Sequence, residues 1–75
     1  MLFPNIEAER ARRGLTKSEL AKCLNVSDAT LKNWMYGKTE IPSSKIVELA
    51  KLFGTSTDYL LGLASDIHGG VHEPD

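Results

Sequence analysis

The sequence predicts an all-α domain, a compact bundle of five short helices. A chain of 75 residues is enough for one domain. Its apolar residues recur at helical spacing in short segments, which glycines and capping residues separate. Sustained period-two alternation and Asn-Gly or Asp-Gly hairpin turns are absent, so the sequence gives no sign of strands.

The first helix is expected from about Pro4 to Arg13. Proline suits a first helical turn, where its missing N–H has no helical partner to lose. Gly14 is expected to end the helix. Acidic residues stand early and basic residues late, which complements the helix dipole: Glu7 and Glu9, then Arg10, Arg12 and Arg13.

The second helix is expected to begin after Thr16. As the N-cap, Thr16 forms a capping box with Glu19, three residues later. The inner face is aliphatic and carries Leu20, Ala21 and Leu24. Asn25 is expected to end the helix, because asparagine tolerates the left-handed backbone conformation better than most side chains do.

The third helix is expected to run from an N-cap at Ser27 to Gly37. Leu31 and Trp34 lie three residues apart on one face, which assigns Trp34 to the core rather than to stacking on a base. Because Thr30 occupies the third helical position, no second capping box is expected.

Proline and serines in "KTEIPSSK" predict a connection before the fourth helix. This helix is expected from Ser43 or Ser44 to Phe53, with Gly54 ending it. Its inner stripe follows the i, i+3, i+4, i+7 pattern with Ile46, Leu49, Ala50 and Phe53.

A short fifth helix is expected after "GTSTD", with Thr57 as its N-cap and Gly62 at its end. The apolar residues of this region either close the core or form a contact between two copies: Tyr59, Leu60, Leu61 and Leu63. Residues 1–63 are expected to form the domain, and residues 64–75 a flexible acidic tail.

Composition favours a globular cytoplasmic protein. The chain is 41% hydrophobic and 25% charged. No apolar run approaches the ~20 residues that a membrane span needs, and the start lacks the order of a signal peptide. The single cysteine, Cys23, excludes an internal disulfide and is expected to be an inert, partly exposed thiol. Gly69 and Gly70 separate His68 from His72 and disfavour a shared helix, so neither a metal nor a cofactor is expected.

The formal net charge of −1 is unevenly distributed along the chain. Residues 63–75 contain three acidic residues and no lysine or arginine, so the first 62 residues carry 9 basic against 7 acidic side chains, a net charge of +2. The segment from Lys17 to Lys38 has four lysines against Glu19 and Asp28, also a net charge of +2. A mildly basic body with an acidic tail fits a nucleic-acid partner, and equally an ordinary solvated surface.

The stretch "LAKCLNVSDATLKNW", residues 20–34, has an apolar pattern too broken for one helix and too regular for a loop. Two short helices that cross at a steep angle explain the pattern. Small Ala21 would lie at their closest approach, with Asn25 and Val26 in the turn. This is the pattern of a helix-turn-helix unit.

Two segments carry a family resemblance, "RARRGLTKSELAKCLNVSDATLKNWMYGK" and "KIVELAKLFGTSTDYLLG". With them, the chain from Asn5 to Gly62 resembles the Cro/C1-type helix-turn-helix family of phage repressors and small bacterial regulators. The resemblance implies a lambda repressor-like domain of five helices that binds double-stranded DNA, usually as a homodimer on a palindromic operator. It also implies a transcriptional regulator, which we expect to be a repressor.

The third helix, about residues 27–36, is expected to enter the major groove of DNA. Because its apolar residues face the core, its outer face presents the positions that make most base contacts in similar proteins: Asp28, Ala29, Lys32 and Asn33. Asn33 has the chemistry for a bidentate pair with adenine, and Lys32 for guanine or a phosphate. Ala29 suits a thymine methyl group and Asp28 suits cytosine N4. A carboxylate near a helix N-terminus is also stabilised without DNA, which is a second explanation for Asp28.

Phosphate contacts are expected near both ends of this helix. Lys17 stands at the N-terminus of the second helix, whose free N–H groups also suit a phosphate. Lys38, Ser44 and Lys45 flank the other end and are expected to hold the same strand. Ser27 is a further candidate, although helix capping alone explains it.

Two positions depart from the family pattern. The family often has an acidic residue that pairs with an arginine of the first helix, but Met35 stands at that position. Arg10 is therefore expected to contact Glu7 or the DNA backbone. Tyr36 replaces an asparagine, and either hydrogen-bonds a phosphate or packs against the domain.

A second functional class stays open from the sequence. A protein-binding module, such as an antitoxin-like or anti-repressor partner, would keep this fold without binding DNA, because fold does not fix function. An enzyme is not expected, since the sequence lacks paired carboxylates, a Ser-His-Asp set and a phosphate loop. A domain of this size is also expected to lack a ligand pocket of ~300 Å³ or more.

Overall fold

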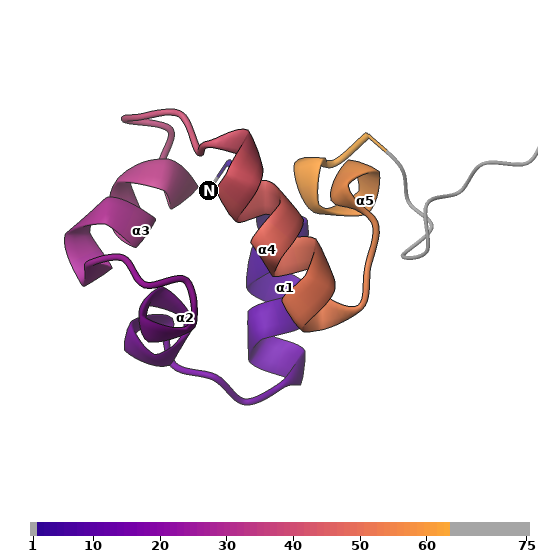
Figure 1. Cartoon of the computed structure of the whole chain (residues 1–75), viewed down its shortest axis with the longest axis horizontal. Helices are drawn as coiled ribbons and strands as arrows, with labels where there is room; N and C mark the ends of the chain where they lie inside the picture. Colours follow the sequence, from indigo (N-terminus) through magenta and orange to yellow (C-terminus); the bar gives the residue numbers. More distant parts are fainter. Residues whose placement is uncertain (1, 64–75) are drawn as a thin grey trace, which may run out of the picture.

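The computed structural model describes residues 2–63, and within them it confirms an all-α domain of five helices without strands. The helices are α1 (Pro4–Arg12), α2 (Lys17–Cys23), α3 (Asp28–Met35), α4 (Ser43–Phe53) and α5 (Thr57–Leu61). Figure 1 shows α2 and α3 side by side at one end of the domain and α5 at the other, with α1 and α4 between them. The predicted acidic tail, with His68 and His72, lies outside the described residues.

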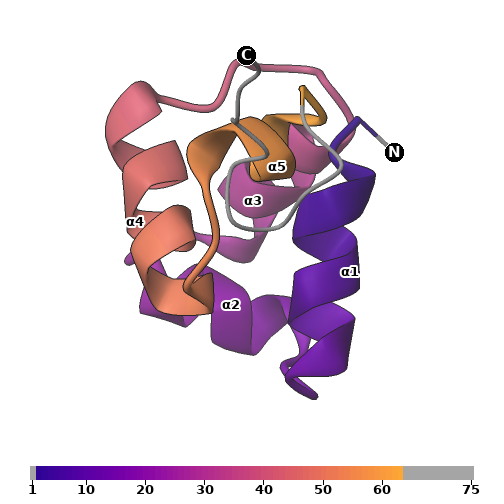
Figure 2. The same cartoon turned by 90° about the vertical axis from the view of Figure 1, so that its right-hand side faces the viewer.

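The turned view in Figure 2 shows α1 and α4 standing on opposite sides of the domain. Helix α5 packs against both of them. None of the helices in the described stretch is long and apolar enough to cross a membrane.

The helix ends follow the capping signals of the sequence. The Thr16 hydroxyl accepts from the Glu19 N–H at 3.0 Å, and the Glu19 carboxylate accepts from the Thr16 N–H at 2.7 Å, which confirms the capping box. The Ser27 hydroxyl accepts from the Thr30 N–H at 3.1 Å. Asn25 has a φ of 59°, so it adopts the left-handed conformation predicted for it.

The cap of α5 corrects one prediction. Ser56, not Thr57, is the N-cap, and its hydroxyl accepts from the Tyr59 N–H at 3.0 Å. The backbone of Ser56 is extended, with φ −84° and ψ 156°, which is the conformation that an N-cap residue adopts. Thr57 is instead the first helical residue.

The core contains most of the inner-face residues that the apolar spacing predicted, together with Ile6 and Met35, which it did not predict; Ala50 is only partly buried. Its buried hydrophobic residues are Ile6, Leu20, Ala21, Leu24, Leu31, Trp34, Met35, Ile46, Leu49, Phe53, Tyr59 and Leu60. The side chain of Trp34 is only 5% exposed, so its assignment to the core is confirmed. Each large apolar side chain buried in this way contributes about 1.5–3 kcal/mol to stability, which a domain of this size needs.

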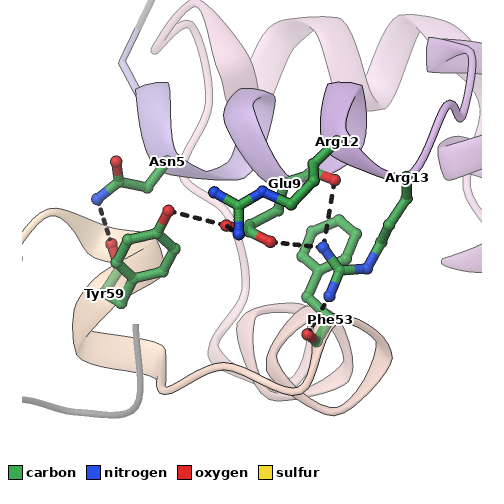
Figure 3. Close-up of polar contacts among 6 residues, drawn as sticks. All are labelled: Asn5, Glu9, Arg12, Arg13, Phe53 and Tyr59. Atoms are coloured by element: carbon green, nitrogen blue, oxygen red, sulfur yellow. Dashed lines mark hydrogen bonds and ion pairs between the residues drawn. The ribbon is translucent and has the colours of Figure 1, made fainter. Parts of the chain in front are cut away.

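A polar cluster joins α1 to α5, which lies at the other end of the domain from α2 and α3 (Figure 1). Its centre is Glu9, which is completely buried. The Glu9 carboxylate accepts from the Tyr59 hydroxyl at 2.9 Å and pairs with Arg13 at 2.5 Å and Arg12 at 3.3 Å. Figure 3 shows these contacts, and we call the four residues the Glu9 cluster.

Further contacts of this cluster tie α1 to α4 and α5. Arg13 donates to the Phe53 carbonyl at the end of α4, and its guanidinium lies 4.8 Å from the centre of the Phe53 ring. Asn5 donates to the Tyr59 carbonyl at 2.7 Å. Burial alone would raise the pKa of the Glu9 carboxyl, but hydrogen bonds from Arg13 and Tyr59 and the nearby positive charges outweigh burial and lower the pKa. The cluster therefore holds an ionised carboxylate inside the domain.

Candidate nucleic-acid interface

The turn from Leu24 to Ser27 ends α2 and leads into α3. The Val26 N–H donates to the Ala21 carbonyl at 3.0 Å, and the Asn25 N–H donates to the Lys22 carbonyl at 3.0 Å. Ala21 is completely buried, as expected of a small residue where two helices approach each other. The three residues that predicted a helix-turn-helix unit are therefore in the places that such a unit requires.

Two side-chain contacts that the sequence analysis missed strengthen this unit. The Ser18 hydroxyl on α2 donates to the Asp28 carboxylate on α3 at 2.6 Å. The Lys45 ammonium donates to the Leu24 carbonyl at 2.7 Å and lies 3.3 Å from the Glu48 carboxylate. Asp28 thus has a partner in the absence of DNA, and Lys45 satisfies one of the carbonyls left free at a helix C-terminus.

A groove of about 370 Å³ opens where α1, α2 and α3 meet. Its apolar residues are Leu20, Leu31 and Met35, and its charged and aromatic residues are Glu7, Arg10, Lys17, Asp28, Lys32 and Tyr36. The expectation that this domain is too small for such a pocket was therefore wrong. The space between three helices depends on how their side chains pack, and chain length does not determine it.

A second and more open depression, of about 270 Å³, adjoins the groove. It is lined by Lys32, Asn33, Tyr36 and Lys38. Lys32 and Tyr36 line both, so the two concavities bring together six predicted DNA-binding residues: Lys17, Asp28, Lys32, Asn33, Tyr36 and Lys38. The remaining four line neither: Ser27, Ala29, Ser44 and Lys45.

The outer face of α3 has the exposure expected of a contact surface. Ala29 and Lys32 are exposed and Asn33 is half-buried. Tyr36, the C-cap, has a side chain that is 55% exposed, so packing against the domain leaves most of it in solvent. Within residues 2–63, no ion pair involves Lys17, Lys32 or Lys38. This face therefore presents three lysines that form no ion pair within the described part of the domain.

The departures at Met35 and Arg10 are resolved by contacts within the domain. Arg10 pairs with Glu7 on its own helix and donates to the Leu15 carbonyl. The hydrogen bond from Arg10 is the main reason why the pKa of the Glu7 carboxyl is lowered, and the charge of Lys17 lowers it further. Met35 is buried and lines the groove. Of the two expected partners of Arg10, the structure shows Glu7.

Within residues 2–63, no three His, Cys, Asp or Glu side chains gather as a metal site would need. Cys23 is exposed and lies outside both concavities.

Comparisons with known proteins point in the same direction as this geometry. The sequence model of a family described as Helix-turn-helix matches residues 6–60. The HTH-type transcriptional regulator ImmR of Bacillus subtilis (strain 168) is 32% identical over 61 residues, which are 81% of this chain and 48% of that protein. The chain thus spans about half the length of this curated relative. No solved structure gives a significant match.

Proposed function

The chain belongs to the Cro/C1-type helix-turn-helix family, and from that premise we propose that it binds double-stranded DNA sequence-specifically and represses transcription. The observation that carries the proposal is the face formed by α2 and α3. Three lysines of this face have no ion-pair partner among residues 2–63, and they lie beside polar side chains suited to base edges. We propose the cytoplasm as the place of action, where such a regulator meets its DNA.

In this proposal, α3 enters the major groove. Its inner residues, Leu31 and Trp34, are buried, so its orientation against the domain is fixed. Lys32 and Asn33 are then the principal base-reading residues, with Ala29 toward a thymine methyl group. A good bidentate contact such as Asn33 to adenine is worth about 1–3 kcal/mol of discrimination against a wrong base. Asp28 reads cytosine with the carboxylate oxygen that does not accept from Ser18.

Phosphate contacts position the domain without specifying sequence. Lys17 and Lys38 are the strongest candidates, because both are exposed and neither forms an ion pair within residues 2–63. Ser44 is exposed at the start of α4, and Tyr36 offers its hydroxyl. Ser27 and Lys45 are weaker candidates, since their side chains are already engaged by Thr30, Leu24 and Glu48.

A homodimer on a palindromic operator completes the proposal. Tyr59 and Leu60 are buried and close the core, whereas Leu61 and Leu63 are 38% and 75% exposed. The exposed pair is the proposed contact between two copies. A dimer whose two α3 helices stand about 34 Å apart would reach successive major grooves on one side of the duplex.

A selection from randomised duplex DNA at low salt tests the proposal. We expect an enriched inverted repeat, because two copies of α3 read two half-sites. The double variant Lys32→Ala/Asn33→Ala should lose the enrichment, and Lys51→Ala, an exposed lysine on α4, is the matched control that should keep it. Failure of the unaltered protein to enrich any sequence would contradict the proposal and favour a protein-binding module.

A further inference from the structure

We propose that the groove between α1, α2 and α3 binds a small monoanion with an apolar body, such as a medium-chain or aryl carboxylate. The groove combines an apolar floor with two lysines that form no ion pair among residues 2–63. The apolar body of the proposed ligand would lie on the apolar floor, and its negative charge would face the two lysines.

The size and floor of the groove suit the apolar part of such a ligand. Its volume of about 370 Å³ lies within the range of ~300–1,000 Å³ that small-molecule sites occupy. Leu20, Leu31 and Met35 supply the apolar lining. Methionine is unbranched and flexible, so Met35 is able to adapt its side chain to an alkyl or aryl group.

The charges around the groove favour a ligand that carries a single negative charge. Arg10, Lys17 and Lys32 are positive and Glu7 and Asp28 are negative, so three against two leaves a net charge of +1. Arg10 is already paired with Glu7, and Asp28 accepts from Ser18. Lys17 and Lys32 are therefore the two basic residues available to bind the negative charge of a ligand.

These two lysines come from different helices and flank the same apolar floor. Lys17 begins α2 and Lys32 lies in the middle of α3. A carboxylate held between the two ammonium groups would direct its apolar body onto Leu31 and Met35. Glu7 and Asp28 would repel a second negative charge, so a carboxylate fits the groove better than a phosphate dianion does.

The consequence for regulation rests on the proposed function. Lys17 and Lys32 are also proposed DNA contacts, so one lysine cannot serve a ligand carboxylate and the DNA at the same time. A carboxylate in the groove should therefore compete with DNA and release the domain from its operator.

The test is a titration of the DNA-free protein with octanoate, followed by NMR of the labelled methyl groups of Leu20, Leu31 and Met35. We expect saturable shifts of these methyl groups with octanoate, weaker shifts with octanol and none with octylamine, since only octanoate has both halves of the ligand. Lys17→Gln and Lys32→Gln should each weaken octanoate binding about two- to fivefold, as expected for a partly exposed ion pair. Lys51→Gln on α4 is the matched control and should bind octanoate as the unaltered protein does.

Three results would overturn the inference. One is the absence of saturable shifts at millimolar octanoate. Another is equal affinity for octanoate and octanol, which would show that the lysines play no part. The third is a pattern of shifts that is largest at the exposed methyl groups of Leu61 and Leu63, which would show non-specific adsorption. Because the titration contains no DNA, octanoate binding by a protein that binds no DNA would support the site and refute only the proposed function.

Discussion

The Glu9 cluster and the α2–α3 face are both rich in charge, but they use it in opposite ways. In the cluster, a completely buried carboxylate is surrounded by Arg12, Arg13 and the Tyr59 hydroxyl. On the α2–α3 face, Lys17 and Lys32 are exposed and form no ion pair within residues 2–63. A buried carboxylate that is paired holds the helices together, whereas exposed lysines without an ion pair are available to a partner.

The two regions also differ in their basic side chains, which are arginines in the Glu9 cluster and lysines on the α2–α3 face. The three arginines of the α1 region all pair with carboxylates of that helix, and Arg13 also reaches a carbonyl on α4. The planar guanidinium has several donors in a fixed arrangement, which suits such bridging. Among the lysines, Lys45 belongs with the arginines, because it bonds the Leu24 carbonyl and pairs with Glu48. We therefore expect variants of the Glu9 cluster to change stability and variants of the α2–α3 face to change DNA binding.

The largest effect is expected from Glu9→Gln. The substitution removes the charge that Arg12 and Arg13 pair with and weakens the buried hydrogen bonds to this carboxylate, so we expect the free energy of unfolding to fall by about 2–3 kcal/mol. Urea denaturation measures this change. Glu40→Gln is the control, since Glu40 is exposed and its replacement should change stability by no more than about 0.5 kcal/mol. Equal stability of the two variants would remove the structural role of the cluster.

Lys32→Ala and Asn33→Ala test the other region. Each should weaken binding to the selected DNA site by about 1–3 kcal/mol, because each removes a proposed contact to a base edge. Neither side chain belongs to the core, so the free energy of unfolding should change by no more than about 0.5 kcal/mol. Fluorescence anisotropy of a labelled duplex measures the affinity. Undiminished affinity in both variants would refute the proposed docking of α3.

Tyr59→Phe tests a single contact of the Glu9 cluster. It deletes only the hydroxyl that donates to the Glu9 carboxylate, and we expect a loss of about 1.5 kcal/mol of stability with no loss of DNA affinity. Tyr36→Phe is the matched control for stability, since Tyr36 is more than half exposed. A thermal shift no larger for Tyr59→Phe than for Tyr36→Phe would contradict the prediction.

The Glu9 cluster is expected to make the domain less stable in acid. The pKa of Glu9 is lowered below its ordinary value of 4.5, so its contribution to stability is present above pH 4.5 and is lost as the pH falls through the lowered pKa. Urea midpoints at neutral pH and well below pH 4.5 should therefore differ less in Glu9→Gln than in the unaltered protein. A smaller dependence will remain, because the pKa of Glu7 is lowered too. Parallel acid profiles of the two proteins would exclude Glu9 as a source of this dependence.

The smallest effect is expected from Lys17→Ala. The loss of a phosphate contact should weaken binding to all DNA sequences alike and reduce the salt dependence by about one charge. Lys22→Ala is the matched control, because Lys22 is exposed on the same helix and lies outside both concavities. If Lys17→Ala altered the preferred sequence instead, the assignment of Lys17 to a phosphate would be wrong.

The helices and the core could be predicted because their signals are local. Thr16 and Ser27 are caps that bond residues three positions away, and Asn25 has a backbone conformation that few other residues tolerate. The apolar spacing of Leu31 and Trp34 was enough to place both in the core. At α5, the sequence predicted Thr57 as the cap, and the backbone conformation showed that the neighbouring Ser56 has this role.

The missed features depend on residues that are distant in the sequence. Glu9 was interpreted only as an acidic residue that complements the helix dipole, because its partner Tyr59 is 50 residues away. One signal was present, since Glu9 lies three residues after buried Ile6 and so shares its face. Lys45 and Leu24 are 21 residues apart, and the groove requires side chains from three helices. The DNA-binding roles of the α2–α3 residues stay predictions.

An amide NMR titration of the protein with the duplex selected from random DNA tests directly whether the α2–α3 face binds DNA. We expect the largest shifts on adding DNA at Lys17, at Asp28 to Asn33 and at Lys38, with little change at Glu9 and Tyr59. The largest shifts at Leu61 and its neighbours in α5, with α3 unchanged, would contradict the claim that the exposed charge of the α2–α3 face binds DNA.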